Sequence, residues 1–167
     1  ILGTRTTISE KVHQQKLLQK GVDKHRIKSQ ACHGVATEIE IDPQGVAVET
    51  LIDAYMEEAA RTLKGRKTVL AALCCTHFAY SGNIFQTKLL DRLSGEVVIL
   101  NPNIEMSGFL FRNEPQPTFS STKISVAVIS KIDLVQPKII SMSNAVRPIS
   151  EKTANALVNY AFKPDLF

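Results

Sequence analysis

The fold is decided by residues 68–78, which read Thr-Val-Leu-Ala-Ala-Leu-Cys-Cys-Thr-His-Phe. The run from Thr68 to Cys74 is continuously apolar, and it follows a helical pattern closed by Gly65. A short run of this kind is typical of a parallel strand buried on both faces. Hydroxyl and ionisable groups begin where the strand ends, and parallel sheets bind ligands at that end of their strands. The stretch therefore predicts both the core of a sheet and the place of its chemistry.

The segments around this run alternate between helix and strand patterns. Across residues 44–63 the apolar side chains recur at spacings of three and four, which predicts an amphipathic helix. The other expected elements are a strand ending over 1–4, a helix over 9–19, a strand over 26–32, a helix over 83–93, a strand over 97–100 and a helix over 103–112. Strands alternating with helices predict an α/β fold, here a three-layer one with a mostly parallel sheet and helices on both faces.

The last third of the chain has a different pattern. Residues 114–121 contain two prolines and are expected to form a loop. Apolar and polar residues alternate over 123–132, which predicts a strand, and 138–142 is a candidate for another. Ser150 is expected to cap a helix with Ala154, Leu157, Val158 and Ala161 on one face. We therefore divide the chain into an α/β domain over 1–113 and a segment over 114–167 that completes or extends the fold.

Composition excludes several classes of protein. The 167 residues carry a net charge of +4 spread along the chain, without a basic stripe interleaved with aromatics, so nucleic-acid binding is not expected. No apolar stretch reaches the roughly 18 to 20 residues that cross a bilayer. The three cysteines form no Cys-x-x-Cys pair. We therefore expect neither a disulfide framework nor a metal site, and a reducing cytoplasm as the compartment.

The chain opens on Ile1-Leu2-Gly3-Thr4, which reads as the tail of a strand running into a turn, without an initiator Met. We expect that preceding sequence is absent and that the fold is an incomplete copy lacking its N-terminal part. If a first domain is missing, an apolar face should be uncovered.

The chemistry of the strand end is concentrated in three consecutive residues. Cys75 offers a thiol that could act as an acyl-transfer nucleophile or as the base that removes a proton from carbon. Thr76 adds a hydroxyl donor, and His77 adds a proton carrier that titrates near neutrality. The alternative is an inert, buried structural cysteine, which is common in proteins.

Three segments resemble the aspartate/glutamate racemase family in order and spacing. Residues 72–78 resemble the Leu-Gly-Cys-Thr-His-Tyr/Phe motif of glutamate racemases, with Cys74 in the place of Gly. Residues 1–7 resemble the family's central strand and Thr-x-x-Thr turn. Residues 31–34, followed by Glu40, resemble its Ala-Cys-Pro motif with a Glu eight residues after the Cys. The chain is thus similar to the C-terminal portion of such a racemase.

The resemblance implies racemisation of glutamate or aspartate without pyridoxal phosphate, metal or any other cofactor. Cys75 would be one of two thiols that act on opposite faces of the substrate α-carbon. His77 would tune the protonation of that thiol, and Glu40 would orient His77, with Glu38 as the competing choice. The remaining residues would contact the amino-acid substrate: Thr76 at its carboxylate, and Thr4 and Thr7 in the wall of the pocket.

Several departures from the family pattern leave other functions open. The family's first catalytic cysteine lies in an upstream Cys-Asn-Thr motif that has no counterpart here, and Cys32 corresponds to a non-catalytic family position. Positions 10, 13 and 33 hold Glu, His and His in place of Ser, Tyr and Pro. The isolated chain is thus expected to be inactive, with another segment or chain completing the site, and the resemblance is compatible with a homodimer. The alternatives are an isomerase or lyase of another small carboxylate and a non-catalytic or partner-dependent binding protein.

Other residues have simpler interpretations. His13 and His25 lie among polar residues and are expected on the surface. The pair Tyr55-Met56 belongs to the core stripe of a helix. Residues 101–103 predict a turn and helix cap, and 109–111 could be core or a partner surface.

Overall fold

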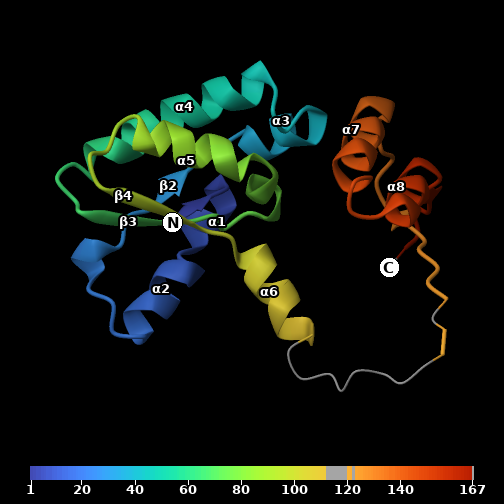
Figure 1. The fold of residues 1–167 in the computed structure, drawn as a ribbon, viewed down its shortest axis with the longest axis horizontal. Coiled ribbons are helices and arrows are strands. Elements are labelled where there is room, and N and C mark those ends of the chain that lie inside the picture. Colours follow the sequence, from blue (N-terminus) through green and yellow to red (C-terminus); the bar gives the residue numbers. More distant parts are fainter. Residues whose placement is uncertain (112–119, 122, 167) are drawn as a thin grey trace. The chain divides into compact units, whose positions relative to one another are not determined.

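The computed structural model describes residues 1–111, 120–121 and 123–166 (Figure 1). The chain divides into two compact units, Ile1–Asn113 and Glu114–Phe167, which are described separately. Most of the loop expected over 114–121, and the expected domain boundary at 113/114, lie outside the described residues.

Over its described residues, 1–111, the first unit contains four short parallel strands. They are β1 (Leu2–Gly3), β2 (Gln30–Ala31), β3 (Thr68–Ala72) and β4 (Glu96–Leu100). β1 pairs with β2, and β3 pairs with β4 over five residues in each strand. An isolated bridge between Leu2 and Leu73 joins the two pairs, and Cys74 N donates to Leu2 O at 2.7 Å. The strands therefore run in the spatial order β2, β1, β3, β4.

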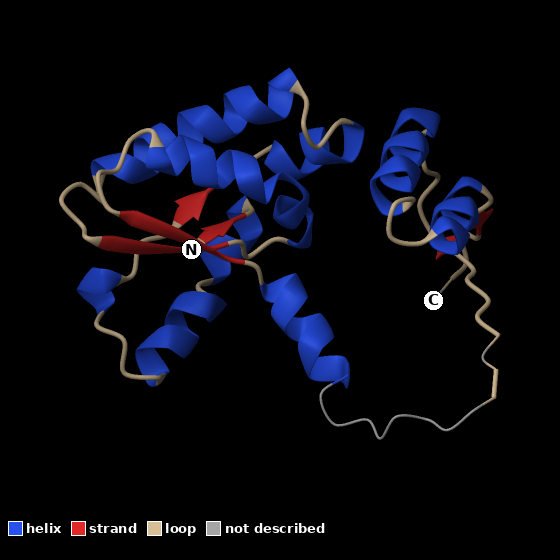
Figure 2. Cartoon of the chain, viewed as in Figure 1, coloured by secondary structure: helices blue, strands red, loops and turns tan. Residues whose placement is uncertain are grey.

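Helices connect these strands (Figure 2). They are α1 (Arg5–Glu10), α2 (Val12–Gln19), α3 (Val35–Ile41), α4 (Val46–Arg61), α5 (Gly82–Leu90) and α6 (Pro102–Phe111), with 3₁₀ helices η1 (Lys24–Arg26) and η2 (Thr76–Ser81). The unit is thus mixed α/β with parallel strand pairs, as the alternating sequence pattern predicted.

The core of this unit lies between the strands and the α4–α5 pair. α4 and α5 pack together over one face of the strands, and α2 lies on the other side (Figure 1). The apolar stripe of α4 is fully buried at Val48, Ile52 and Met56, which confirms the predicted helix. Phe78 and Phe85 are also fully buried, with ring centroids 5.2 Å apart. Aromatic pairs at this separation add to the area that they bury.

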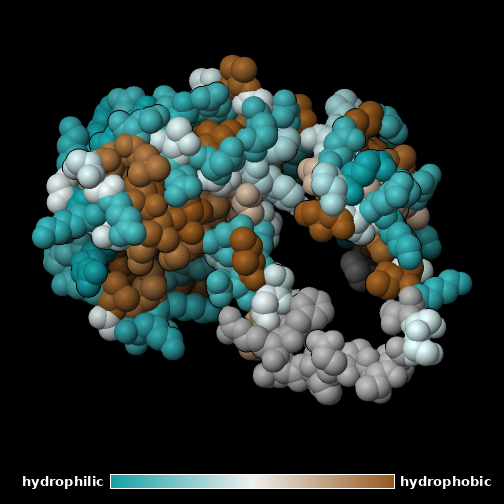
Figure 3. Space-filling view, viewed as in Figure 1, coloured by the Kyte–Doolittle hydropathy of each residue, from teal (hydrophilic) through white to brown (hydrophobic). Residues whose placement is uncertain are grey.

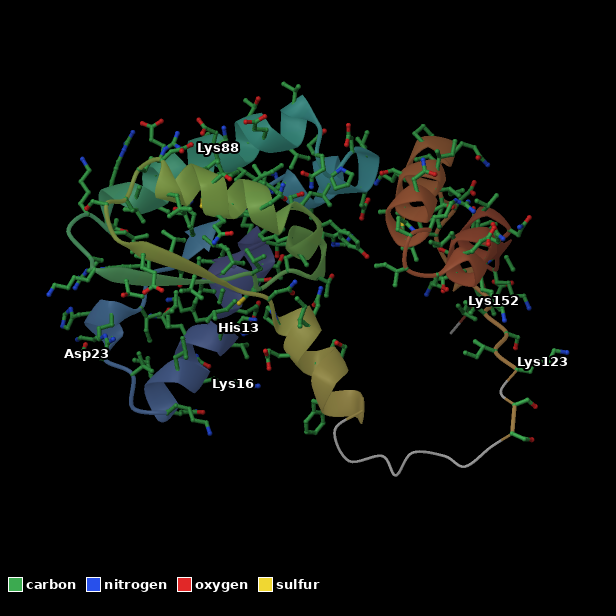
Figure 4. All side chains as sticks on the ribbon, in the orientation of Figure 1. His13, Lys16, Asp23, Lys88, Lys123 and Lys152 are labelled. Atoms are coloured by element: carbon green, nitrogen blue, oxygen red, sulfur yellow. The ribbon has the colours of Figure 1, made fainter. Side chains whose placement is uncertain are left out.

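A polar clamp also joins α4 to α5. Lys88 lies between the two helices (Figure 4), with Nζ 2.6 Å from Glu49 Oε1 and 3.6 Å from Asp53 Oδ1. Arg92 Nη2 donates to Asp53 Oδ1 at 2.9 Å. The hydrogen bond to Glu49 is the largest cause of a raised Lys88 pKa. The side chains of these pairs remain partly exposed to solvent, so they orient the helices more than they stabilise them.

The strand β3 is buried on one face only, which corrects the expectation of burial on both. Val69 and Ala71 point toward the α4–α5 side and are buried, whereas Leu70 is 61% exposed. The register places Leu70 beside Val98 and Ala72 beside Leu100, so all four belong to the same, open face. Figure 3 shows apolar side chains gathered on the surface around these strands. An unbroken apolar run indicates that both faces of a strand carry apolar side chains. Which of these faces is buried depends on the helices that pack against the strand.

Two predictions in the first sixty residues are wrong in detail. The helix expected over 9–19 is two helices, because Lys11 adopts a left-handed conformation (φ 56°) between α1 and α2. The strand expected over 26–32 is reduced to Gln30–Ala31, and η1 lies just before it. The sequence pattern also gave no sign of α3, whose seven residues follow Gly34 at φ 82°. That conformation favours glycine.

In the part of the second unit that the structure describes there are two helices and one parallel strand pair. The elements are β5 (Ile129–Ser130), α7 (Gln136–Val146), α8 (Glu151–Val158) and β6 (Ala161–Phe162). α7 packs on α8, and the fully buried Ser143 donates its hydroxyl to Ala154 O at 3.1 Å. α7 and α8 therefore form a helical hairpin at the centre of the unit, and β5 and β6 precede and follow it in the chain.

The sequence predictions for this unit are partly wrong. The strand expected over 123–132 is paired only at Ile129–Ser130, and the candidate strand over 138–142 lies inside α7. Pro137 in the first turn favours a helix at that position. Ser150 caps α8 as predicted, accepting from Thr153 N at 3.2 Å, but the helix ends at Val158 and Ala161 begins β6. Within the described ranges, no helix combines the length and the apolar character needed to cross a bilayer.

Candidate functional site

The candidate site lies at the carboxyl end of the two central strands. The chain leaves β1 for α1 at Thr4 and continues from β3 through Cys75 into η2. Because Leu2 pairs with Leu73 in parallel register, Thr4 and Cys75 stand at the same level on neighbouring chain segments. In the spatial order β2, β1, β3, β4, the chain passes from β1 to β2 on one side and from β3 to β4 on the other. Open parallel sheets bind ligands at the place where two neighbouring strands are continued in opposite directions, which here lies between β1 and β3.

Cys75, His77 and Glu40 form a connected row of side chains. His77 Nδ1 lies 3.8 Å from Cys75 Sγ, and its Nε2 lies 3.0 Å from Glu40 Oε1. The ion pair with His77 is formed by Glu40 and not by Glu38, the other acid considered for it. All three side chains are partly exposed.

The contacts on each ring nitrogen indicate the direction of proton transfer. A carboxylate at Nε2 favours the imidazole tautomer that carries its hydrogen there. Nδ1 is then an acceptor facing the Cys75 sulfur. In this arrangement the imidazole can take the thiol proton, and Glu40 stabilises the charged ring that results. Such a row can generate a thiolate that acts as a nucleophile or as a base.

Buried anchors hold η2, which carries His77, against the rest of the unit. Phe78 follows His77 directly and is fully buried in the core. At the end of η2, the Ser81 hydroxyl donates to Pro43 O at 2.6 Å, and Gln44 Nε2 donates to Tyr80 O at 2.7 Å. These bonds tie η2 to the loop that follows α3, the helix that carries Glu40. The segment that carries His77 and the segment that carries Glu40 are therefore bonded to each other, which supports the 3.0 Å contact between the two side chains.

The threonines expected to contact substrate have different surroundings. Thr4 caps α1, accepting from Thr7 N at 3.2 Å, and the two threonine hydroxyl oxygens are 2.9 Å apart. Both are partly buried at the end of β1. Thr76 is exposed, and its carbonyl accepts a hydrogen bond from Asn103 Nδ2 at 3.0 Å. Capping explains the spacing of Thr4 and Thr7 without a ligand, so their substrate contacts stay a prediction.

The three cysteines differ sharply in environment. Cys32 is 1% exposed, and burial raises the pKa of its thiol to about 12. Burial also raises the pKa of the half-buried Cys74. Cys75 has extended backbone (φ −140°, ψ 132°) and lies three residues after the end of β3, beyond the bridge between Leu73 and Leu2. Cys75 Sγ lies 3.8 Å from His77 Nδ1, whereas the contact that fixes Cys74 is the hydrogen bond from its backbone N–H to Leu2 O.

Alkylation with iodoacetamide at pH 8 should separate these thiols. We expect Cys32 to react about 10³-fold more slowly than an ordinary thiol, because only the thiolate reacts and a pKa of about 12 leaves it protonated. Peptide mass spectrometry after timed quenching measures each site, with urea-unfolded protein as the control. Modification of Cys32 in the folded protein as fast as in urea would contradict the buried, protonated state.

Some features of the site could not be found from sequence. Gln44, Ser81 and Asn103 support η2 through hydrogen bonds to backbone carbonyls, and no motif marks such bonds in advance. Residues 101–103 were expected to cap a helix, and Asn101 Oδ1 does accept from Asn103 N at 3.1 Å. Among the described residues, no group of three His, Cys, Asp or Glu side chains is placed to hold a metal ion.

Comparison of the chain with family models, with curated proteins and with solved structures found no match in any of the three. The functional assignment therefore depends on the residues at the carboxyl end of β1 and β3, on their geometry and on the three motif segments.

Proposed function

We propose that this chain is the C-terminal portion of a cofactor-independent racemase of acidic amino acids, with Cys75 as one of its two acid/base thiols. The observation that carries the proposal is the row Glu40–His77–Cys75 at the carboxyl end of the central parallel strands. The motifs around Cys75, Thr4 and Cys32 support the same family. On this proposal the complete fold is a three-layer α/β structure to which the first unit contributes.

The reaction needs a base on one face of the α-carbon and an acid on the other. The Cys75 thiolate takes the α-hydrogen as a proton, and the C–H bonding pair stays on the substrate as a carbanion delocalised into its carboxylate. A second group then gives a proton to the opposite face. The cycle closes when the Cys75 thiol releases its proton to solvent and the second group takes a proton back from solvent. Donors at Thr76, Thr4 and Thr7 would hold the carboxylate where its charge grows.

The second proton carrier must come from elsewhere. Cys32 does not suit the role, because it is buried and its pKa is raised to about 12. Cys74 does not suit it either, because burial raises the pKa of its thiol and so opposes formation of the thiolate. We propose that a segment outside residues 1–167, or another chain, supplies this group, and that the isolated chain does not racemise.

The proposal is tested by the exchange of α-hydrogen for deuterium in deuterated water. The complete gene product is incubated with each enantiomer of glutamate and aspartate, and the α-proton signal is followed by nuclear magnetic resonance. We expect exchange of both enantiomers of one of these acids. Exchange only with other amino acids, hydantoins or small diacids in a parallel panel would favour an isomerase of another small carboxylate. The absence of exchange with every compound would favour a non-catalytic binding protein.

A further inference from the structure

The side chain of Asn103 connects the start of α6 to the turn that carries His77. Its Nδ2 donates to the carbonyl of Thr76 at 3.0 Å, a residue 27 positions earlier in the chain. Its backbone N–H is fixed separately, because it donates to Asn101 Oδ1 at 3.1 Å. The carboxamide is thus not used for capping its own helix, and its described partner belongs to the Cys-Thr-His turn.

This bond bears directly on the contact between Cys75 and His77. Thr76 is the residue between them, so its peptide group sets the direction in which each of their side chains leaves the backbone. The Sγ–Nδ1 separation of 3.8 Å is long for a hydrogen bond, even one to sulfur, so a small rotation of this peptide would break it. Glu40 holds the far side of the imidazole ring, and Asn103 holds the backbone on the near side.

We propose that Asn103 is a positioning residue for the thiol–imidazole pair. It acts by fixing the Thr76 carbonyl, and through it the approach of His77 Nδ1 to Cys75 Sγ. The proposal rests on the function proposed above for Cys75 and His77, and it adds a residue from the next strand–helix connection that touches neither side chain.

The rate of Cys75 alkylation as a function of pH tests this role without any substrate. The measurement uses the full chain with Cys74→Ala, so that the neighbouring thiol does not contribute. In this background we compare Asn103→Ala, Asn103→Asp and His77→Asn. Asn101→Asp is the matched control, because it adds the same charge near the same helix end while keeping the oxygen that caps Asn103 N. Circular dichroism melting establishes that each variant is folded.

We expect both Asn103 variants to lower the alkylation rate near pH 7 by about threefold to tenfold, the factor that corresponds to one hydrogen bond. Their pH profiles should move toward that of His77→Asn, while Asn101→Asp keeps the starting profile. A role confined to stability would lower the melting temperature and leave the profile unchanged, and that result would overturn the inference. Equal shifts of the pH profile in Asn103→Asp and Asn101→Asp, with no shift in Asn103→Ala, would also overturn the inference.

Failure of this inference can be distinguished from failure of the proposed function. If His77→Asn changes the Cys75 profile and the Asn103 variants do not, only the positioning role is wrong. If His77→Asn itself has no effect, the thiol–imidazole pair does not work as proposed, and both conclusions fall together.

Discussion

Replacing Cys75 with serine should abolish α-hydrogen exchange in the complete protein, with a loss of about 10³-fold or more in rate. A serine hydroxyl is far less acidic than a thiol, so His77 cannot convert it into an alkoxide that removes a proton from carbon. The substitution changes one atom at a partly exposed position, so the fold should be unaffected. Exchange is measured by nuclear magnetic resonance with the preferred enantiomer at saturating concentration.

Two controls make this result specific. Cys74→Ser alters the adjacent thiol, which has no part in the proposed Glu40–His77–Cys75 row, and it should retain exchange within a few fold of the parent rate. Glu40→Gln keeps the shape of the partner of His77 and removes its charge, so we expect a loss of about 10-fold to 100-fold. Exchange at the parent rate in Cys75→Ser would contradict the racemase assignment, whatever the other variants show.

Replacing Phe85 with alanine should lower the free energy of unfolding of the first unit by about 3–5 kcal/mol. Phe85 is fully buried on α5, and its ring lies 5.2 Å from that of Phe78. Truncation leaves a cavity between α5 and η2, and it also removes the ring-to-ring contact. Phe78 anchors η2 directly after His77, so the same change should make the His77–Glu40 contact less well defined.

The effect on stability is measured by urea unfolding followed by far-ultraviolet circular dichroism, because the chain has no tryptophan. Leu90→Ala is the matched control, since it truncates an exposed apolar residue on the same helix and should change stability by under about 0.5 kcal/mol. A Phe85→Ala protein as stable as the control would mean that the two rings do not form part of the core.

The sequence patterns predicted those parts of the first unit in which local periodicity and tertiary packing agree. The stripe of α4 is one example, since its spacing of three and four matches the face that is buried at Ile52 and Met56. The change from apolar to polar residues just before η2 is another example. It was expected at the end of a buried strand, where the chain reaches the edge of the sheet. The motif at Cys75 directed attention to His77 and Glu40, whose side chains do meet.

Other features depend on contacts between distant segments, which periodicity does not report. The alternation over 123–132 satisfies a strand pattern, yet β6 pairs with only two of its residues. Leu70 is as apolar as Val69, and only the position of α4 and α5 decides that it remains exposed. The choice between Glu38 and Glu40 likewise depended on the direction in which α3 leaves Gly34.

The parallel register between β1 and β3 makes the end of β3 sensitive to chain length. Deleting one residue from the strand would slide its downstream half along the partner strands and turn every side chain to the other face. Cys75 would then take the place of Cys74, and Thr76 would take the place of Cys75. The length of β3 thus determines which side chain stands beside Thr4 at the end of the sheet, and a change of one residue would remove the thiol from that place.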